Sequence, residues 1–349
     1  MLSCARLRVY SICRRVAYDY REEIAVRKRT FLLGLLSFFF LFGSQKAWSQ
    51  SALTNVKITS PSRSIAFSDI YVAVDRGFFR EEKLEVELVQ ARPDLAMAGL
   101  IAGEVDADTA AGAAATASQR GMPLKIVAVT LYRPLFWLVT KPEVKSVAEL
   151  KGTTLGITSL NGIQHRTASH LLRRSGLDPT KDVTSIVIGG APMLLSALNS
   201  GSIQVTALSP PTIIVARDKF KMRIWGEPPK DVVALQSGFS VSEKQLAEKR
   251  DLVRRILRAR AKAHKYFLEN EKGATETLAK FMKLDPATIV ESYRLARFGF
   301  TKDGTLIDKD AEEFLREDAK ILGLSSPAAI SKVFDFSVQR EANKELGIN

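Results

Sequence analysis

The chain has 349 residues, of which 46% are hydrophobic and 26% charged, so it is long enough to bury a sizeable core. Lys and Arg outnumber Asp and Glu by 51 to 38. After residue 50, however, no block of five or six basic residues occurs, and aromatic side chains do not interleave with Arg and Lys. The composition therefore gives no support to nucleic-acid binding.

The first fifty residues have the pattern of an export signal. Arg27-Lys28-Arg29 precede the apolar run 31–42, and the small residues Ala47 and Ser49 follow it. This order predicts a secretory signal peptide over 1–49, cleaved near Ser49, and a periplasmic or otherwise extracytoplasmic protein. The apolar run is short for a membrane span, which needs about 20 residues, although an uncleaved anchor stays an alternative. Residues 1–26 exceed what a signal requires, which leaves the true start codon open.

Both cysteines, Cys4 and Cys13, fall inside this leader. The exported chain is therefore expected to have no disulfide, no thiolate nucleophile and no cysteine-based metal site. The leader also holds nine Lys and Arg against three acids, which leaves 42 against 35 for the rest, or +7. A mildly basic exported protein is the expectation.

Strand and helix patterns alternate from residue 56 onwards. Strands are indicated by β-branched or alternating apolar residues at 56–59, 84–89, 105–111 and 124–130. Helices are indicated by apolar spacing and by terminal glycines at 69–79, 95–102 and 112–120. This alternation predicts an α/β fold with mostly parallel sheets flanked by helices.

The stretch from Lys145 to Arg166 combines a helix, a strand and a polar turn. Ser146 and Glu149 have the spacing of a capping box, which predicts a short capped helix. Residues 153–157 are β-branched and apolar, as in a strand that is covered on both faces. The turn that follows opens a second helix and holds small polar residues: Ser159, Asn161 and Gly162. A helix N-terminus at the carboxyl end of a strand suits a polar or anionic ligand.

Three segments of the first half recur in the second half at nearly one spacing. Ile58-Thr59-Ser60 returns 99 residues later as Ile157-Thr158-Ser159, and Gly77-Phe78 parallels Gly176-Leu177 at the same offset. Residues 98–111 match 196–209 at an offset of 98. Three ordered matches predict two lobes built on one βαβαβ plan, with the carboxyl ends of both sheets facing a cleft.

The last third of the chain is mostly helical and strongly charged. A strand over 232–241 is expected to run back into the first lobe. The helices that follow are predicted at 243–269, 273–283, 286–297 and 308–322, and a last one begins at Ser326-Pro327. The predicted domains are lobe one, formed by 51–131 plus 233–349, and lobe two, formed by 139–226. The crossovers at 131–140 and 226–240 would act as hinges.

The chain offers little that indicates catalysis. It has no phosphate-binding loop, dinucleotide fingerprint, zinc-protease motif or nucleophile elbow. His165 and His170 are five residues apart, about 140° around a helix, so they do not share a face for a metal. His264 lies in a helix rich in Lys and Arg, where a solvated surface position is expected. We therefore predict no catalytic residues, no metal and no cofactor.

The recurring feature is a set of small, polar turns where strands end and helices begin. Any one of them is typical of an ordinary βα loop, but five turns on one cleft favour ligand binding. Arg63, Arg133, His165 and Arg166 would add positive charge, which favours an organic anion. The predicted ligand-binding residues are Ser60, Ser62, Arg63, Ala111, Gly112, Ser159, Asn161, Gly162, His165, Gly189, Gly190, Ala191 and Ser209.

Four segments resemble the SsuA/TauA/NMT1-THI5-like solute-binding proteins of ABC importers. They are DIYVAVDRGFFREEKLEVELV, GLIAGEVDADTAAG, VKSVAELKGTTLGI and GGAPMLLSALNSGSIQV, and they occur in order between residues 55 and 265. The resemblance implies a two-lobed type II periplasmic-binding fold, with the ligand between the lobes and a closed form that docks on a membrane permease. Family members take sulfonates, taurine, nitrate, pyrimidines and aromatic acids, so the resemblance does not name this ligand.

Three functions follow from these observations. The first is an extracytoplasmic solute receptor, most simply a monomer, that delivers a small organic anion to an ABC transporter permease. The second is an enzyme similar to the thiamine-pyrimidine synthases of the family. Those enzymes rely on a cysteine-rich motif and an active-site histidine, and the predicted exported chain has no cysteine. The third is a ligand-sensing module that signals without transport.

Overall fold

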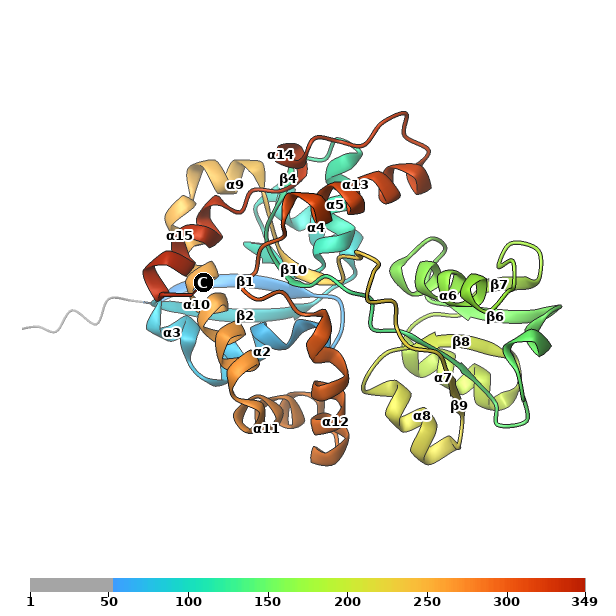
Figure 1. Ribbon diagram of the computed structural model, residues 1–349. Helices are drawn as coiled ribbons and strands as arrows, with labels where there is room; N and C mark the ends of the chain where they lie inside the picture. Colours follow the sequence, from blue (N-terminus) through green and yellow to red (C-terminus); the bar gives the residue numbers. More distant parts are fainter. Residues whose placement is uncertain (1–52, 349) are drawn as a thin grey trace, which may run out of the picture. The chain divides into compact units, whose positions relative to one another are not determined.

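The computed structural model describes residues 53–348 (Figure 1). The predicted signal peptide, its cleavage near Ser49 and both cysteines lie outside the described residues. Residues 53–348 lie in one compact unit. It contains two separate five-stranded sheets, here called sheet A and sheet B. Within the described part of the chain, no helix is long and apolar enough to cross a membrane.

Sheet A takes four strands from the start of the chain and one from much later. Its order is β2-β1-β3-β10-β4. Strand β1 pairs parallel with β2 and β3, and β10 pairs antiparallel with β3 and β4. The strands are β1 (Thr54–Ser60), β2 (Leu84–Gln90), β3 (Ala107–Asp108), β4 (Leu124–Leu131) and β10 (Ser237–Ser242). The predicted returning strand therefore exists, although it begins five residues later than expected.

Sheet B repeats the same plan with the strands in between. Its order is β7-β6-β8-β5-β9, with β6 parallel to β7 and β8, and β5 antiparallel to β8 and β9. The strands are β5 (Trp137–Thr140), β6 (Thr153–Ile157), β7 (Val183–Val187), β8 (Val205–Leu208) and β9 (Arg223–Trp225). The expected α/β class is thus confirmed. The boundaries of the two predicted lobes and hinges stay a prediction.

The internal repeat extends to single side chains. In sheet A, the backbone N–H of Lys57 donates to the carboxylate of Asp106, 2.9 Å away. In sheet B, the backbone N–H of Thr154 donates to the amide oxygen of Gln204, 3.1 Å away. Asp106 comes just before β3 and Gln204 just before β8, the central strand of each sheet. Each side chain therefore adds one hydrogen bond to the neighbouring strand at the end of the backbone pairing. The two sheets therefore share local chemistry as well as strand order.

The helices beside sheet A differ from prediction in detail. They are α2 (Ser68–Asp75), α3 (Phe78–Glu81), α4 (Pro93–Ala102) and α5 (Ala111–Gln119). The predicted helix 69–79 is split because Gly77 has a φ of +76°, which no α-helix accommodates. Strand β3 is shorter than predicted, because the Asp108 carboxylate accepts the Ala110 N–H at 2.9 Å and turns the chain into α5.

The helices beside sheet B are α6 (Ile163–Arg174), α7 (Ala191–Ser200) and α8 (Thr212–Phe220). The predicted capped helix before β6 is a single 3₁₀ turn, Val147–Leu150. Its capping box does not form, because the Glu149 N–H bonds the Ser146 carbonyl rather than the Ser146 hydroxyl. The hydroxyl instead donates to the Glu149 carboxylate at 3.2 Å.

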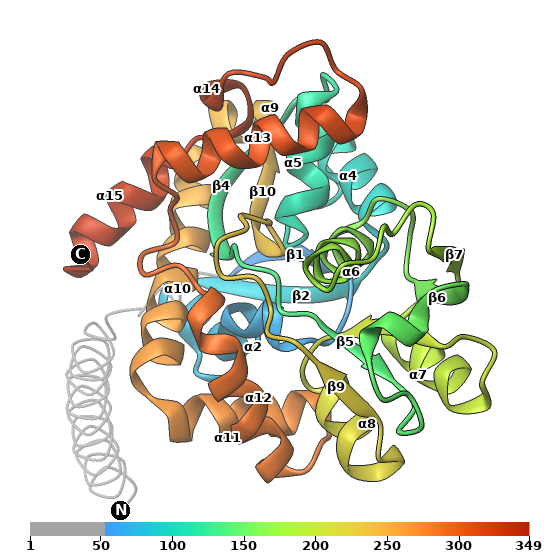
Figure 2. The ribbon, with the colours of Figure 1, turned by 45° about the vertical axis from the view of Figure 1, so that its right-hand side comes forward.

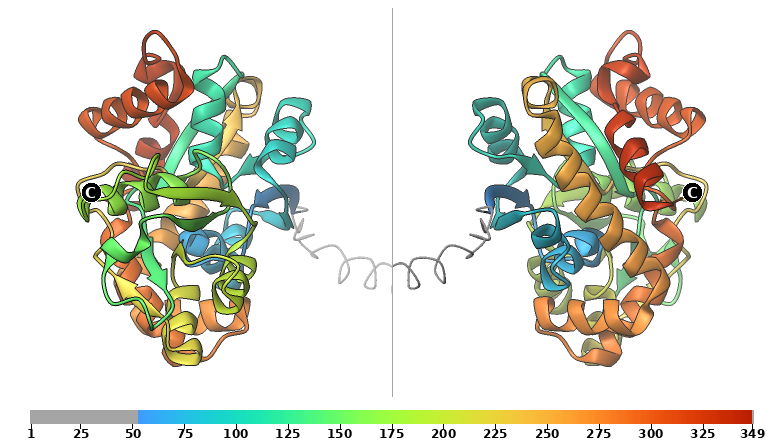
Figure 3. Two further views of the ribbon diagram at one scale, coloured as in Figure 1. Left: turned by 90° about the vertical axis from the view of Figure 1, so that its right-hand side faces the viewer. Right: turned by 90° about the vertical axis from the view of Figure 1, so that its left-hand side faces the viewer.

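The C-terminal helices pack around sheet A. Sheet A with its own helices and these C-terminal helices is here called the sheet A half, and sheet B with α6, α7 and α8 is called the sheet B half. The C-terminal helices are α9 (Glu243–Glu248), α10 (Arg250–Glu269), α11 (Glu271–Met282), α12 (Pro286–Ala296), α13 (Asp308–Leu322), α14 (Ile330–Val333) and α15 (Ser337–Leu346). Helices α11, α12 and α13 match predicted spans closely. The predicted helix 243–269 is divided at Lys249 into α9 and α10, and the predicted helix start at Ser326 is wrong. Residues 324–329 are non-helical, and the Ala328 N–H donates to the Gln119 side chain there. Helix α10 contacts α2 and α15 and runs along the sheet A half (Figure 3).

The buried face of α10 corrects the expectation for His264. Arg260 is fully buried and donates to the Asp69 carboxylate at 3.0 Å. His264, one turn later on the same face, is 2% exposed, and its Nε2 lies 2.8 Å from the Thr301 carbonyl oxygen. Burial, and then the Arg260 charge, hold the pKa of His264 well below its usual range. The prediction of a solvated histidine is wrong because α10 turns this face inward.

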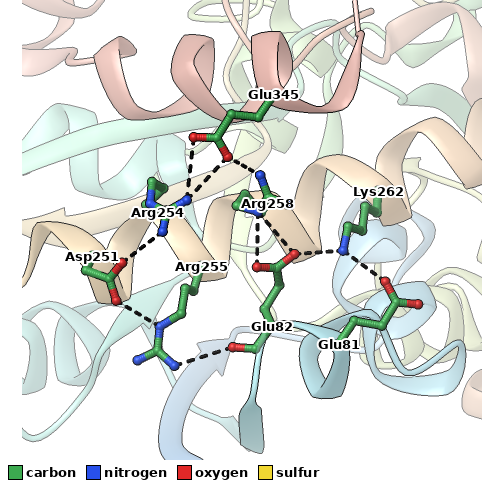
Figure 4. Close-up of polar contacts among 8 residues, drawn as sticks. All are labelled: Glu81, Glu82, Asp251, Arg254, Arg255, Arg258, Lys262 and Glu345. Carbon is green, nitrogen blue, oxygen red and sulfur yellow. Dashed lines mark hydrogen bonds and ion pairs between the residues drawn. The ribbon is translucent and has the colours of Figure 1, made fainter.

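The opposite side of α10 carries a network of ion pairs that ties α3 and α15 to it (Figure 4). Arg258 donates to the Glu82 carboxylate at 3.1 Å and also contacts Glu345 on α15. Lys262 donates to Glu81 at 2.9 Å and to Glu82 at 2.7 Å. All of these contacts lie within the sheet A half, so they stabilise that half alone.

Candidate functional site

The carboxyl edge of sheet B collects three of the five predicted turns. Strands β6, β7 and β8 are adjacent and parallel, so the turns that follow them lie at one edge of the sheet. The predicted residues brought together in this way are Ser159, Asn161, Gly162, Gly189, Gly190, Ala191 and Ser209. His165 joins them from the first turn of α6.

Helix α6 begins at this edge with its backbone donors free. Its N-cap is Gly162, no side chain caps it, and its first turn has no acidic residue. The first backbone bond runs from the Arg166 N–H to the Gly162 carbonyl, so within the described chain the N–H groups of residues 163–165 have no partner. Arg173 and Arg174 occupy the last turn and complement the dipole there. The start of α6 therefore attracts an anion.

His165 holds the turn before α6 rather than supplying charge. Its Nδ1 accepts the Asn161 N–H at 3.0 Å, and its Nε2 lies 3.2 Å from the Ser185 hydroxyl on β7. Burial, and then the Arg173 charge, lower the pKa of His165, so the ring is neutral at pH 7. Asn161 has a φ of +61°, the left-handed conformation that such a tight turn requires.

The Gly162 N-cap lies against the side chain of Ser159. A Cβ built at this position would lie 2.3 Å from the Ser159 hydroxyl oxygen, so that exposed hydroxyl would have to move. The backbone of Gly162 is extended, with a φ of −67°, a conformation that any residue adopts. A larger side chain at this position would therefore displace the Ser159 hydroxyl.

Gln164 is a residue of this edge that the sequence reasoning missed. Its side chain is 2% exposed, its amide oxygen accepts the Thr158 N–H at 3.2 Å, and its amide nitrogen donates to the Ala207 carbonyl at 3.0 Å. Gln164 thus ties the turn after β6 to strand β8. Nothing in the sequence distinguishes this glutamine from an exposed helical residue.

In the turn after β1 in sheet A, several polar groups hydrogen-bond to nearby residues. Ser60 is buried and donates to the Ser62 carbonyl at 3.2 Å, and the same carbonyl accepts the Tyr71 hydroxyl at 2.9 Å. Arg63 is exposed and donates to the Phe281 carbonyl at 3.5 Å, near the end of α11. Within residues 53–348, no carboxylate lies within 4.0 Å of Arg63.

The turn after β3 is covered by the chain that returns to sheet A. Ala111 is fully buried, and a Cβ at Gly112 would lie 2.0 Å from the Leu235 carbonyl oxygen. These two residues therefore have a packing role in the structure. Their predicted contact with a ligand stays a prediction.

Asp108, at the carboxyl end of β3, was also missed. Its side chain is 1% exposed and accepts the Thr59 hydroxyl at 2.7 Å and the Ala110 N–H at 2.9 Å. Burial raises the pKa of Asp108 to about 6, although these hydrogen bonds act in the opposite direction. In the sequence, Asp108 is marked only by its place in the segment Val105-Asp106-Ala107-Asp108. This pattern does not show which of the two aspartates is buried.

The other candidate cations are already paired. Arg133 lies 3.6 Å from Asp310, and Arg166 lies 3.1 Å from Asp318. Two hollows of about 340 and 410 Å³ lie beside α3 and α4, and none of the predicted binding residues lines them. Among residues 53–348, no cluster of three His, Cys, Asp or Glu side chains is arranged for a metal.

Several solved structures with this architecture are periplasmic binding proteins. The nitrate-binding protein NrtA from Synechocystis PCC 6803 matches with a TM-score of 0.67 and 16% identity, over 85% of this chain and 90% of NrtA. The alkanesulfonate-binding protein SsuA from Xanthomonas axonopodis pv. citri, bound to MOPS, matches with a TM-score of 0.63 and 17% identity, over 84% of this chain and 98% of SsuA. The chain has the periplasmic-binding-protein fold.

The family follows from the sequence. A model described as NMT1/THI5 like matches residues 64–274, and the chain belongs to this family. The putative binding protein YtlA of Bacillus subtilis (strain 168) is 24% identical over 293 residues, which cover 79% of this chain and 86% of YtlA. The resemblance stated from the four sequence segments is thereby confirmed.

Proposed function

We propose that the protein is an extracytoplasmic solute receptor that holds a small organic anion between the two sheet halves. The observation that carries the proposal is the uncapped start of α6, whose free N–H groups lie beside the turns of β7 and β8. Arg63, with no acidic partner in the described chain, supplies a cation from the sheet A half. The names of YtlA, SsuA and NrtA, all binding proteins, support this function.

The mechanism is hinge closure. The predicted lobes, 51–131 plus 233–349 and 139–226, rotate about the crossovers at 131–140 and 226–240. An anion first contacts the α6 amides, and closure then brings the sheet A turns to its other side. Ligand binding favours the closed form because only that form offers both sets of contacts. The closed receptor, acting as a monomer without catalysis, delivers its ligand to an ABC permease.

Calorimetry and thermal shift with a panel of small molecules test the ligand class. The panel holds alkyl and aryl sulfonates, taurine, carboxylates, nitrate and thiamine-pyrimidine precursors, with neutral and cationic analogues as controls. We expect only anions to raise the melting temperature. Stabilisation by neutral or cationic compounds alone would refute the anion proposal.

A substitution at the turn tests the site. Gly162→Val, whose side chain would displace Ser159, is expected to abolish binding of the most stabilising anion found in the panel. Ser200→Ala, at the exposed far end of α7, is the matched control and is expected to bind normally. Unchanged affinity in a folded Gly162→Val variant would remove the α6 turn from the site.

A further inference from the structure

Two arginine–carboxylate pairs join the helices of sheet B to those that follow sheet A. Arg166, in the first turn of α6, donates to Asp318 on α13 at 3.1 Å. Arg217 on α8 donates to Glu291 on α12 at 2.8 Å through its Nη2. In both pairs the arginine comes from the sheet B half and the acid from the sheet A half.

The Arg166–Asp318 pair is anchored on one side. Asp318 is 2% exposed, and its second carboxylate oxygen accepts the Gln119 amide at 2.9 Å. Gln119 is itself held, because its amide oxygen accepts the Ala328 N–H at 3.3 Å. The sheet A half thus fixes Asp318 in place, and Arg166 is its only cationic partner among the described residues. Separation of the halves would remove the charge partner of a carboxylate that is buried while the pair is made, so this contact restrains the halves more than a pair of exposed side chains does.

The Arg217–Glu291 pair is easier to break. Both side chains are more than a third exposed, and exposed pairs contribute little to stability. Arg217 also binds the adjacent Asp218, with its Nη2 3.0 Å from the carboxylate, so it keeps an acidic partner when Glu291 moves away. The two pairs therefore differ in cost although they make the same connection.

The pairs lie on opposite sides of the crossover strands. Figures 1 and 2 both show α13 in the upper part of the sheet A half and α12 in its lower part, with the segments that join the two halves passing between them. Helix α8 contacts α12. A rotation about the crossovers must therefore change at least one of the two contacts. Arg166 lies in the same first turn of α6 as the free backbone N–H groups. An anion bound to these N–H groups and the Asp318 carboxylate would therefore both contact the start of α6.

We propose that Arg166–Asp318 and Arg217–Glu291 form a two-point latch that holds the two halves together in the ligand-free protein. The latch rests on the proposed function, because it regulates the closure that would enclose the ligand. Asp318 provides most of the restraint, and Glu291 provides a weaker second contact. Loss of the latch raises the population of separated halves and so reduces the fraction ready to close on a ligand.

Pulsed electron–electron distance measurements on the ligand-free full chain test the latch. Spin labels are placed at Ser196→Cys on α7 and Lys244→Cys on α9, both exposed, in a Cys4→Ser/Cys13→Ser background. The unmodified latch should give one narrow distance distribution. Asp318→Asn with Glu291→Gln should increase a longer-distance population about tenfold or more, with Glu291→Gln alone having the smaller effect.

The matched control removes an ion pair within one half. Glu345→Gln breaks contacts to Arg254 and Arg258 inside the sheet A half and should leave the distances unchanged (Figure 4). If Asp318→Asn does not fold, Arg166→Gln tests the same contact from its more exposed side. A narrow, unshifted distribution in the double variant, or in a folded Arg166→Gln, would overturn the latch, as would an equal shift in Glu345→Gln. No ligand is needed, so a failed ligand screen is distinguishable from a failed latch.

Discussion

The two sheets share one strand order, but their carboxyl edges end differently. At sheet B, the turns after β6 and β7 are exposed, and α6 begins with free backbone donors. At sheet A, the start of α5 is covered by Leu235, and the Asp108 carboxylate accepts the Ala110 N–H there. The two sheets therefore show that the same strand order can end in differently exposed turns. One edge offers backbone amides and the other contributes a side chain, Arg63.

The largest expected effect tests the covered edge. Gly112→Ala would place a Cβ 2.0 Å from the Leu235 carbonyl, a backbone atom that cannot move aside cheaply. We expect a loss of about 3 kcal/mol in the free energy of unfolding, measured by chemical denaturation. Gly190→Ala at the open edge of sheet B, whose Cβ would meet only Pro192 at 3.8 Å, is the control. Equal losses in both variants would contradict the contrast between the edges.

The next effect concerns the support of the sheet B edge. Gln164→Ala leaves the Thr158 N–H and the Ala207 carbonyl without their buried partner. We expect the free energy of unfolding to fall by about 2 kcal/mol, together with faster hydrogen exchange at Thr158. An unchanged exchange rate at Thr158 would show that another group holds the turn.

Asp108 gives a pH signature to sheet A. Its pKa is about 6 in the folded protein, above the ordinary value of 3.8, so the folded state binds the proton more tightly. This group therefore adds stability as pH falls through 6 towards 4, and its contribution is lost as pH rises. Between pH 7 and 5 we expect about 1.4 kcal/mol more gain in wild type than in Asp108→Asn. Identical pH profiles in urea denaturation would contradict the raised pKa.

The smallest effect isolates Arg63. Because this side chain is exposed, Arg63→Gln should leave the melting temperature unchanged. Affinity for the best anion of the panel should fall about fivefold, with a weaker salt dependence, measured by calorimetry. Arg80→Gln, an exposed arginine paired with Glu85 outside the predicted site, is the control. Equal affinity in Arg63→Gln and wild type would leave the sheet A half without a charged contact to the ligand.

Much of the fold was predictable because its signals are local. Strand β6, helix α13 and the helical span of α10 follow from periodicity and from terminal glycines. The spacing of 99 residues between Ile58 and Ile157 indicated one plan used twice, and strands β1 and β6 occupy matching positions in their sheets. The turn at Asn161 and Gly162 was predictable too, since small polar residues follow a buried strand there.

Other features depend on contacts between distant residues, which no local pattern records. Leu235 covers Gly112 across 123 positions of the chain, so this predicted ligand turn also has a packing role. His264 was expected in solvent, but the inward face of α10 is set by Asp69 and Thr301. Arg166 was one of four candidate cations for the site, and its guanidinium binds Asp318, which the sequence did not indicate.

The sequence by itself thus determined most of the elements, the repeat and the family, because these depend on neighbours along the chain. Only the tertiary structure decided which turns stay open, which histidine is buried and which arginine is free, because charge and burial depend on what packs against them.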